Sequence, residues 1–464
     1  MKKVRILVIL VLVAALVLAA CATPEADPVA PDDNNDPVQE PIDDGNGDDA
    51  DVNDDDVVVD TTVDAEGLHV TIFVGQPADE HGMELLNEQV VMFEELFPGN
   101  TLEIRTGDMT IEGGALTTML HAGIDLPDII NTNSGPGRIG LLANAGVIQP
   151  LDEMYARNDW RGRISGGAMS LVTVYDGQIW EVPNTMDCIT VWYNIEIFAE
   201  HGLTAPTTWD EFMAINEQLL DAGVEPLAVG GLDGFSVGWL FGNILQSVAG
   251  EDMVYQLTNS EIPWTTPEVV RAAEIFQGFV DQGIISDLAV SRGNQEALFM
   301  FLDGMMAMYF TGTWVIGDLY DNDMLDNVST FTLPSYRGAA QTFPTSGLGN
   351  SWIVPAGITD TAAAELYVEF LLAPERAVIE AANPRSGGIF ATTAFAESPV
   401  LNPPILRDAI ASISGGAGFN PSVFIGHETR TAYFQNLQGL LAGLITPLEA
   451  MENIQVGQDL DREE

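Results

Sequence analysis

A tryptophan stands directly after a short apolar run in the stretch FLDGMMAMYFTGTW, residues 301–314. The run from Met305 to Phe310 has the length of a buried strand, and a Thr-Gly-Thr turn ends it before Trp314. Tryptophan often packs in a protein core. Ligands, however, bind at strand ends in open α/β sheets, where an indole offers them a flat apolar surface. The local pattern leaves both roles open for Trp314.

An acidic residue, Asp187, stands four residues after Pro183 in the strand-like run VPNTMDCITVWYN. A carboxylate within an apolar strand is costly unless it is paired. A ligand in a cleft would satisfy Asp187, and so would a nearby arginine. The histidines have no metal-binding spacing, because they lie far apart in the sequence. We therefore predict no metal site and no cofactor.

The elements that must position these residues alternate between strands and helices. Residues 68–74 alternate like a strand, and residues 83–97 carry apolar side chains at helical spacing up to Pro98-Gly99. Strands over 101–107 and 126–133 alternate with helices over 114–123 and 137–146. This order predicts an α/β fold with a mostly parallel sheet that helices cover on both faces.

A second α/β series begins near Thr190. It contains helices within residues 207–223, 266–283 and 292–304, and a glycine ends each of them. Thr207 or Thr208 caps the first of these helices, and Glu211 completes a sequence close to a capping box. Further helices are expected within 360–375, with a stop at Pro374, and within 427–443 and 446–460.

The N-terminal residues have the features of an export signal. Three basic residues precede the apolar run from Ile6 to Ala20, which is too short for a comfortable membrane span. The run ends in Leu-Ala-Ala-Cys21, which resembles the lipobox of bacterial lipoproteins. We therefore expect a signal peptide over 1–20 and a lipid anchor on Cys21, which places the protein on the outer face of the cell membrane. If Cys21 carries lipid, Cys188 is the one remaining cysteine and no intramolecular disulfide can form.

The composition after the signal is strongly acidic. Residues 22–66 contain 17 acidic residues and no basic one, which predicts a disordered, extended tether over 21–66. The rest of the chain has 13 arginines, 52 acidic residues and no lysine. Such a charge opposes binding to nucleic acid and to anionic ligands, and it suits a neutral or cationic one. Adaptation to a salty habitat would explain the same excess.

Six segments in one order carry a resemblance to a known family. They are NEQVVMFEELFPGNTLEI, LPDIINTN followed by LLANAGVIQPLDE, GQIWEVPNTMDCITVWYNIEIFAEHGL, PTTWDEF, FLDGMMAMYFTGTW and LLAGLITPLEAMENI. In these segments the chain resembles the extracellular solute-binding proteins of bacterial ABC importers, specifically the sugar-binding family that includes the maltose-binding protein. The resemblance implies a monomeric receptor with two α/β lobes and a ligand cleft between them. We expect lobe 1 to span 67–185 plus 350–395 and lobe 2 to span 186–349 plus 396–464.

The resemblance also implies roles for individual residues. Trp314 falls where the family has a stacking tryptophan, and Asp187 falls where it has an acidic sugar contact. This favours a ligand role for both. Trp239 matches a tryptophan near the cleft, although its apolar neighbours favour a core role about equally.

Further ligand contacts are expected at polar positions, each with an alternative. The candidates are Gln76, Asp79 and Glu80, which a solvated loop would also explain; Asn131, Asn133 and Ser134, at a strand end; Asn350, which could instead bond hinge backbone; and Arg385, which could instead hold a carboxylate of the protein. The sequence NTNSGPG lacks the aromatic and charged residues of the maltose-binding member at this point, which argues against a maltodextrin ligand.

The leading functional hypothesis is a non-catalytic receptor that delivers a sugar to the permease of an ABC importer. One alternative is a receptor of the same fold for another solute, such as a polyamine, which the negative charge would favour. A second alternative is a secreted carbohydrate-active enzyme with a pair of carboxylates. No such pair stands in a recognisable catalytic setting.

Overall fold

The computed structural model describes residues 66–77, 80–111, 113–338, 342–414 and 418–463. The predicted signal peptide, Cys21 and nearly all of the acidic tether lie outside these residues, so their roles stay predictions. Cys188 is a buried free thiol. None of the described helices combines the length and the apolar composition that a membrane crossing requires.

A mixed sheet of ten strands organises the part of the chain that the structure describes. Its main path has the order β2-β1-β3-β10-β6-β8-β7, and β9, β11 and β12 pair beside this path. The strands are β1 (His69–Gly75), β2 (Thr101–Gly107), β3 (Ile129–Asn133), β6 (Val182–Asn194), β7 (Glu225–Ala228), β8 (Met306–Gly312), β9 (Val328–Phe331), β10 (Thr345–Ile353), β11 (Ile389–Phe390) and β12 (Gly418–Phe419). A separate hairpin pairs β4 (Val174–Tyr175) with β5 (Gln178–Ile179).

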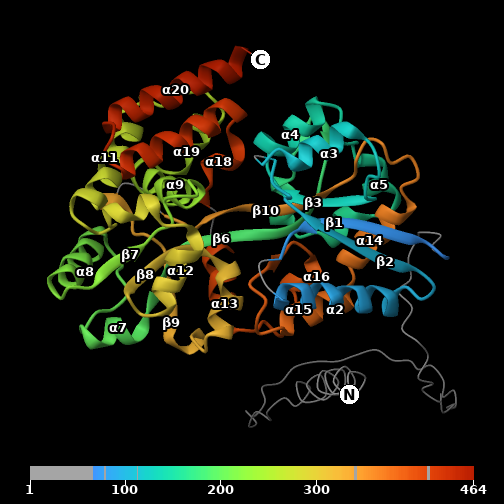
Figure 1. Cartoon of the computed structure of the whole chain (residues 1–464), viewed down its shortest axis with the longest axis horizontal. Coiled ribbons are helices and arrows are strands. Elements are labelled where there is room, and N and C mark those ends of the chain that lie inside the picture. Colours follow the sequence, from blue (N-terminus) through green and yellow to red (C-terminus); the bar gives the residue numbers. More distant parts are fainter. Residues whose placement is uncertain (1–65, 78–79, 112, 339–341, 415–417, 464) are drawn as a thin grey trace, which may run out of the picture. The chain divides into compact units, whose positions relative to one another are not determined.

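The two middle strands, β6 and β10, join two groups of elements. They pair antiparallel, with Thr345 opposite Ile189 at one end and Trp352 opposite Val182 at the other. Beyond this shared stretch β10 pairs with β3, whereas β6 pairs with β8 and β9. Figure 1 shows β6 and β10 side by side at the centre of the sheet. We call them the crossing strands.

The expectation of a mostly parallel sheet is right for only part of the sheet. Pairing is parallel for β1 with β2, β1 with β3, β7 with β8, and β10 with β12. All pairings of β6 are antiparallel, as is that of β10 with β3. The reason is that β6 and β10 cross between the groups in opposite directions, so each must pair antiparallel with the other.

Helices cover both faces of the outer strands in the first group. Because side chains alternate along a strand, Ile129 and Ile130 of β3 face opposite sides of the sheet, and both are fully buried. Ile129 lies in one core with Phe93 and Phe370, and Ile130 lies in another with Leu120. The helices and turns of this group are α2 (Glu80–Leu96), α3 (Ala115–Ala122), α4 (Pro136–Asn144), α5 (Asp152–Arg157), η1 (Trp160–Arg163), α6 (Gly166–Leu171) and α14 (Ala362–Leu371).

Two carboxylates one helical turn apart attach α14 to the segment around η1. The Glu365 carboxylate accepts from Arg157 at 2.5 and 3.0 Å. The Glu369 carboxylate accepts from the Trp160 indole at 2.8 Å and from Arg163 at 2.6 Å. Both glutamates are almost completely buried. Buried charges are tolerated when they are paired and hydrogen-bonded in this way.

The second group packs around β7, β8 and the far end of β6. Val191 and Trp192 of β6 are fully buried in different cores, Val191 with Phe241 and Phe276, Trp192 with Leu319. Its helices and turns are α7 (Ile195–Glu200), α8 (Trp209–Asp221), α9 (Phe235–Ala249), α10 (Glu251–Thr258), α11 (Pro267–Asp281), η2 (Asp287–Ser291), α12 (Asn294–Leu302), η3 (Thr313–Val315), α13 (Ile316–Asp321), η4 (Leu325–Asn327), η5 (Tyr336–Gly338), α18 (Pro421–Phe424), α19 (His427–Leu441) and α20 (Pro447–Glu463).

The remaining helices follow α14 in the chain. They are α15 (Pro374–Ala382), α16 (Thr393–Ala396) and α17 (Pro404–Ser414). Ala377 of α15 and Phe395 of α16 share a core with Trp192. The chain therefore passes between the groups more than once, and the residue boundaries of the two predicted lobes stay a prediction.

Most of the predicted helices form close to their expected bounds. The side chain of Thr208 caps α8, and Glu211 completes the capping box. Pro374 was predicted to end the helix of α14, and it is also the first residue of α15. Proline fits there because the first position of a helix needs no backbone N–H donor. No helix was predicted over 235–249, where the structure has α9.

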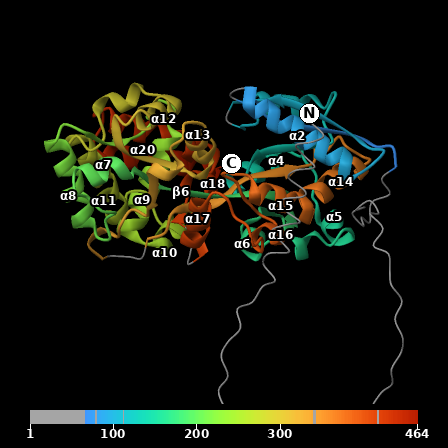
Figure 2. The ribbon, with the colours of Figure 1, turned by 90° about the horizontal axis from the view of Figure 1, so that it is seen from below.

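The two groups also touch away from the crossing strands, at α4 and α18. A Cβ atom on Gly137 would lie 2.2 Å from the carbonyl oxygen of Ile425, and one on Gly135 would lie 2.2 Å from Cγ1 of Val423. The buried Arg430 of α19 donates through Nη1 to the Gly137 carbonyl at 2.9 Å. Figures 1 and 2 show α18 beside α4. The glycines at the start of α4 thus allow backbone to approach backbone.

Candidate ligand-binding site

Asp187 lies in the middle of the crossing strand β6. It is half-buried, and its carboxylate accepts no hydrogen bond from the described residues. Burial raises the pKa of Asp187 to about 7, and the positive charge of Arg138 opposes this rise in part. The sequence left open whether a nearby arginine would pair with Asp187. Arg138 lies close enough for its charge to act on Asp187, but it donates no hydrogen bond to the Asp187 carboxylate. The carboxylate lacks the partner that a buried charge needs.

Two glycines of β10 leave space beside this carboxylate. Gly347 is the strand partner of Asp187. A Cβ atom on Gly349 would lie 2.2 Å from Oδ1 of Asp187, so no other residue could occupy that position without moving the carboxylate. Between these glycines the ladder with β6 is irregular. Both glycines stand in the sequence SGLGNSW, in which Asn350 but neither glycine was predicted to belong to the site.

Trp314 lies in η3, immediately after β8, and its side chain is 40% exposed. It is therefore not a core residue. Gly312, the last residue of β8, pairs with Ile189 of β6, so Trp314 follows two residues after the end of this pairing. A Cβ atom on Gly312 would lie 2.1 Å from the Trp314 ring, which shows that the indole folds back over this glycine. The Gly-Thr-Trp sequence thus allows an exposed ring at the strand end.

The indole of Trp314 is part of an aromatic row. Its ring centroid is 5.2 Å from that of Trp239, and the Trp239 centroid is 4.9 Å from that of Phe235. Trp239 and Phe235 are half-buried one turn apart at the start of α9. Trp239 packs against the core through its other contacts. We call Phe235, Trp239 and Trp314 the aromatic row.

A loop at residues 385–388 lies against the backbone of η3. A Cβ atom on Gly387 would lie 2.0 Å from the carbonyl oxygen of Thr313. In this loop Arg385 pairs with the carboxylate of Asp321 and lies 5.6 Å from the ring centroid of Tyr320. The structure therefore realises the alternative role for Arg385, a contact with a carboxylate of the protein. Its Nε atom has no partner among the described residues.

A cluster of amides lies where β10 passes between β3 and β6. Oδ1 of Asn350 accepts from Nδ2 of Asn184 at 2.7 Å and from Nδ2 of Asn131 at 3.3 Å. Asn131 also donates to the Ser351 carbonyl. Asn133 is half-buried and is the strand partner of Asn350. The side-chain oxygen of Asn350 thus links β10 to both β6 and β3. Asn184 belongs to this cluster although it was not predicted as a site residue.

Ser134, a further candidate from the end of β3, is fully buried rather than exposed to a ligand. Its hydroxyl donates to Oε2 of Glu181 at 2.6 Å, and Oε1 of the same carboxylate accepts from the backbone of Thr173 at 2.6 Å. Both Ser134 and Glu181 are inaccessible to solvent. The pair therefore fixes the end of β3 against the start of β6.

The candidates after β1 lie in a different setting. Gln76 is exposed at the end of β1, and its side-chain oxygen accepts from Thr106 at 2.7 Å. Glu80 is the first residue of α2, and its side chain lies outside the described part of the structure, as does Asp79. No contact connects Gln76 to Asp187 or to the aromatic row among the described residues. A ligand role for these residues stays a prediction.

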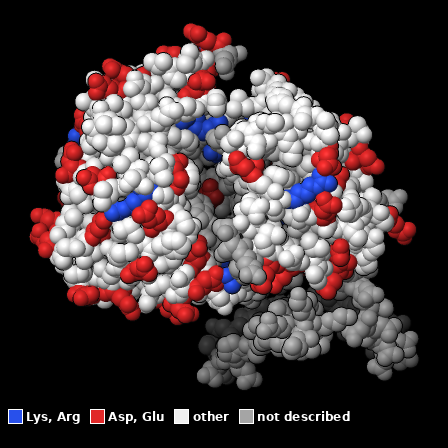
Figure 3. Space-filling view, viewed as in Figure 1, with Lys and Arg blue, Asp and Glu red and all other residues white. Residues whose placement is uncertain are grey.

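The charges on the surface agree with the composition. Figure 3 shows acidic side chains over much of one face and basic ones in a few small groups. Within the described residues no group of histidine, cysteine and acidic side chains is arranged to hold a metal ion. The crossing strands carry amides and one unpaired carboxylate, and the aromatic row on α9 and η3 adds aromatic rings as a third kind of group for a ligand.

Comparison with known proteins adds to this geometry. Two uncharacterised ABC transporter extracellular-binding proteins of Pyrococcus horikoshii are similar to the chain. One is 31% identical over 166 residues, which cover 34% of this chain and 38% of that protein. The other is 23% identical over 365 residues, which cover 76% of this chain and 78% of that protein.

The fold matches solved structures over nearly their whole length. A chitin oligosaccharide binding protein superposes with a TM-score of 0.75 at 22% identity and covers 85% of this chain and 100% of its own. The family model described as bacterial extracellular solute-binding protein matches residues 77–378, more than half of the chain, and includes Asp187, the aromatic row and both crossing strands. The chain belongs to this family of bacterial extracellular solute-binding proteins.

Proposed function

We propose that this protein is a non-catalytic receptor that binds a sugar or oligosaccharide at the crossing strands and delivers it to an ABC importer. The observation that carries the proposal is the exposed Trp314 at the end of β8, together with the unpaired carboxylate of Asp187 in β6, the strand that pairs with β8. A sugar has C–H faces that stack on aromatic rings and hydroxyl groups that donate to a carboxylate. The family supports the receptor role, and the similar chitin oligosaccharide binding protein supports a saccharide as the ligand.

A polyamine is the second candidate ligand, because Asp187 and the acidic surface would attract a cation. Against it, the site disfavours the charged form of Asp187, whose pKa is about 7. A neutral ligand needs only a hydrogen-bond acceptor there. We therefore favour the sugar.

A thermal-shift screen of the purified soluble part, with residues 1–21 removed, tests the proposal. The panel contains monosaccharides, chitin and β-glucan oligosaccharides, maltodextrins, and the polyamines putrescine and spermidine. A ligand that binds only the folded state stabilises it by about 2.7 kcal/mol at a hundredfold excess over Kd. We expect a saccharide to raise the midpoint and to be recovered unchanged after incubation. A shift with polyamines alone, or hydrolysis of the saccharide, would reject the proposal.

We propose further that the receptor is anchored to the outer face of the cell membrane by lipid on Cys21. Support comes from the charged and apolar residues before Cys21 and from a family of extracellular proteins. Replacing Cys21 with serine removes the thiol to which lipid would be attached, so the variant should appear in the soluble fraction of a bacterial host. Equal membrane retention of Cys21→Ser and of the unchanged protein would contradict the anchor.

A further inference from the structure

Trp314 stands on a weak element of the fold. The turn η3 has only three residues and lies between β8 and α13. A single 3-10 turn does little to hold its own conformation, because its hydrogen bonds have poor geometry. The indole is exposed, so packing immobilises little of it. A ring that moves freely in the ligand-free protein loses this freedom on binding, which costs affinity.

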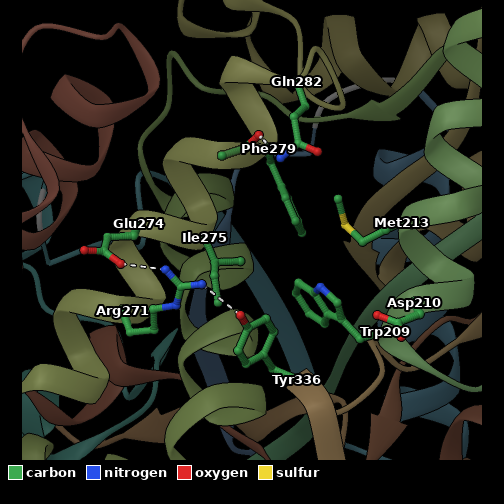
Figure 4. A pocket seen from close by; sticks show the side chains of 10 residues that line it. Trp209, Asp210, Met213, Arg271, Glu274, Ile275, Phe279, Gln282 and Tyr336 are labelled. Carbon is green, nitrogen blue, oxygen red and sulfur yellow. Dashed lines mark hydrogen bonds and ion pairs between the residues drawn. The ribbon is translucent and has the colours of Figure 1, made fainter.

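Trp209 shows how a ring is held by its neighbours instead. Its centroid lies 5.8 Å from that of Phe279 and 5.3 Å from that of Tyr336. Arg271 donates to the Tyr336 hydroxyl at 2.8 Å. Figure 4 shows the three rings turned toward one another, and Trp209 is almost completely buried. Because Trp314 is exposed, its position depends much more on the backbone beneath it.

Gly387 lies directly against that backbone. A Cβ atom on Gly387 would lie 2.0 Å from the carbonyl oxygen of Thr313 and 2.9 Å from Cα of Trp314. The φ angle of Gly387 is not in the left-handed region, so its backbone conformation does not require glycine. The close approach to η3 does require it, since no side chain fits between the two segments.

Arg385 extends this contact along α13. A Cβ atom on Gly317 would lie 3.4 Å from the Arg385 carbonyl oxygen, and the Arg385 guanidinium pairs with Asp321 and lies over the Tyr320 ring. Positions 317, 320 and 321 recur at the spacing of helical turns, so they lie on one face of α13. The loop is thus attached both to the turn that carries Trp314 and to the helix that follows it.

The same loop continues into β11, which pairs with β6 next to Asp187. Ile389 is the strand partner of Met186, the residue before Asp187, and Phe390 is the partner of Thr185. Two residues of extended chain span at most about 7 Å, so the contact of Gly387 with η3 and the pairing of Ile389 with β6 are close together. We call residues 385–390 the bridging segment.

We propose that the bridging segment is a positioning element of the ligand site and that Gly387 is its central positioning residue. The segment fixes the backbone of Thr313 and Trp314 relative to β6, so that the exposed ring is in place before a sugar binds. A pre-positioned ring lowers the entropy cost of binding. This role rests on the proposed function, because it assigns to the sugar site residues that act through Trp314.

Fluorine NMR of the protein without residues 1–21 tests the positioning in the absence of any ligand. In this experiment 5-fluorotryptophan replaces the eight tryptophans, and the Trp314 signal is the one that Trp314→Phe removes. Gly387→Ala adds a Cβ atom where the Thr313 carbonyl leaves no room, so the segment or η3 has to move. We expect the Trp314 signal to shift or to broaden in this variant.

Gly457→Ala is the matched control. A Cβ atom on Gly457 of α20 would lie 2.7 Å from the carbonyl oxygen of Glu428, so this variant strains the packing of α20 on α19. We expect it to lose stability in urea and to leave the Trp314 signal in place. If Gly387→Ala does not fold, Asp321→Asn replaces it, since that change removes the ion pair of Arg385 without adding volume. The Trp314 signal should then shift in Asp321→Asn.

Calorimetric titration with triacetylchitotriose separates positioning from a merely structural role. If this sugar does not bind, the saccharide with the largest midpoint shift in the thermal-shift screen takes its place. Gly387→Ala should bind about tenfold more weakly, a smaller loss than that of Trp314→Ala because the ring is still present. In a chain that already carries Trp314→Ala, Gly387→Ala should cause no further loss, since the segment acts through the ring.

An unmoved Trp314 signal in Gly387→Ala or its replacement, or an equal shift in Gly457→Ala, would overturn the positioning role. Unchanged affinity of Gly387→Ala, or an additive loss in the double variant, would overturn it as well. Failure of every saccharide to bind would instead reject the proposed function, and the fluorine signals would still decide whether the bridging segment positions the ring.

Discussion

Replacing Trp314 with alanine should weaken binding of the transported ligand by roughly thirtyfold. Truncating an aromatic anchor in a binding site typically costs about 2 kcal/mol or more, which corresponds to that loss in affinity. The stability of the ligand-free protein should change much less, because the indole is 40% exposed and covers little of the core. Calorimetric titration and urea unfolding of the same variant measure the two effects separately.

Two further variants serve as controls for Trp314→Ala. Trp264 is fully buried in the core of the second group, so Trp264→Ala should lower the free energy of unfolding by about 3–5 kcal/mol. Phe299 of α12 is 54% exposed, and Phe299→Ala should leave both affinity and stability nearly unchanged. The stacking role of Trp314 is wrong if its variant binds with unchanged affinity or loses stability as Trp264→Ala does.

Local patterns were sufficient to predict most elements of the fold. The helix α2 has side chains with a clear helical period, because it has one face toward a core and one toward solvent. The strand β1 was predicted from its alternating sequence, although Val70, Thr71 and Ile72 are all buried because helices cover both faces. The helix α9 has no such period, since most of its residues between Ser236 and Ser247 are buried on every side. A helix that is apolar all round cannot be told from a buried strand by periodicity, and this is why it was missed.

The candidate site could be predicted only in part, because its contacts are non-local. Trp314 became a candidate from its own neighbours in the sequence, since a turn after a buried strand is a local signal, but only the family resemblance favoured a ligand role over a core role. Asn350, however, bonds Asn131 and Asn184, which are 219 and 166 positions away, and no local pattern indicates those partners. The need for glycine at position 349 depends on Asp187 in another strand. Whether Arg385 would contact a ligand or a carboxylate of the protein could not be decided either, because its partner Asp321 is distant in the sequence.

Asp187→Asn should change both stability and affinity in a way that depends on pH. The pKa of Asp187 is raised to about 7 in the folded protein, from its ordinary value of 3.8. Between these two values the folded state binds the proton more strongly than the unfolded state, so this residue contributes stability at low pH that is lost as pH rises through about 7. Each pKa unit is worth about 1.4 kcal/mol, and solvent reduces the total at this half-buried site.

Asparagine has nearly the same shape as aspartic acid and does not titrate, so the variant should lack this loss. Urea unfolding should find Asp187→Asn more stable, relative to the unchanged protein, at pH 8 than at pH 4. Asp128 provides a matched control, because burial also raises its pKa and its carboxylate bonds backbone in the first group of elements. Asp128→Asn should alter the pH dependence of stability but not that of binding.

The same titration determines the strength of ligand binding if hydroxyl groups of a sugar donate to Asp187. Hydrogen bonds to a charged group are worth about 1 kcal/mol more than bonds to a neutral one, so affinity should rise about fivefold as pH increases from 5 to 8 and Asp187 loses its proton. Asp187→Asn should bind more weakly at pH 8 and show a flat profile. Calorimetric titrations at both pH values test this, and a variant that keeps the affinity and the pH profile of the unchanged protein would remove Asp187 from the binding site.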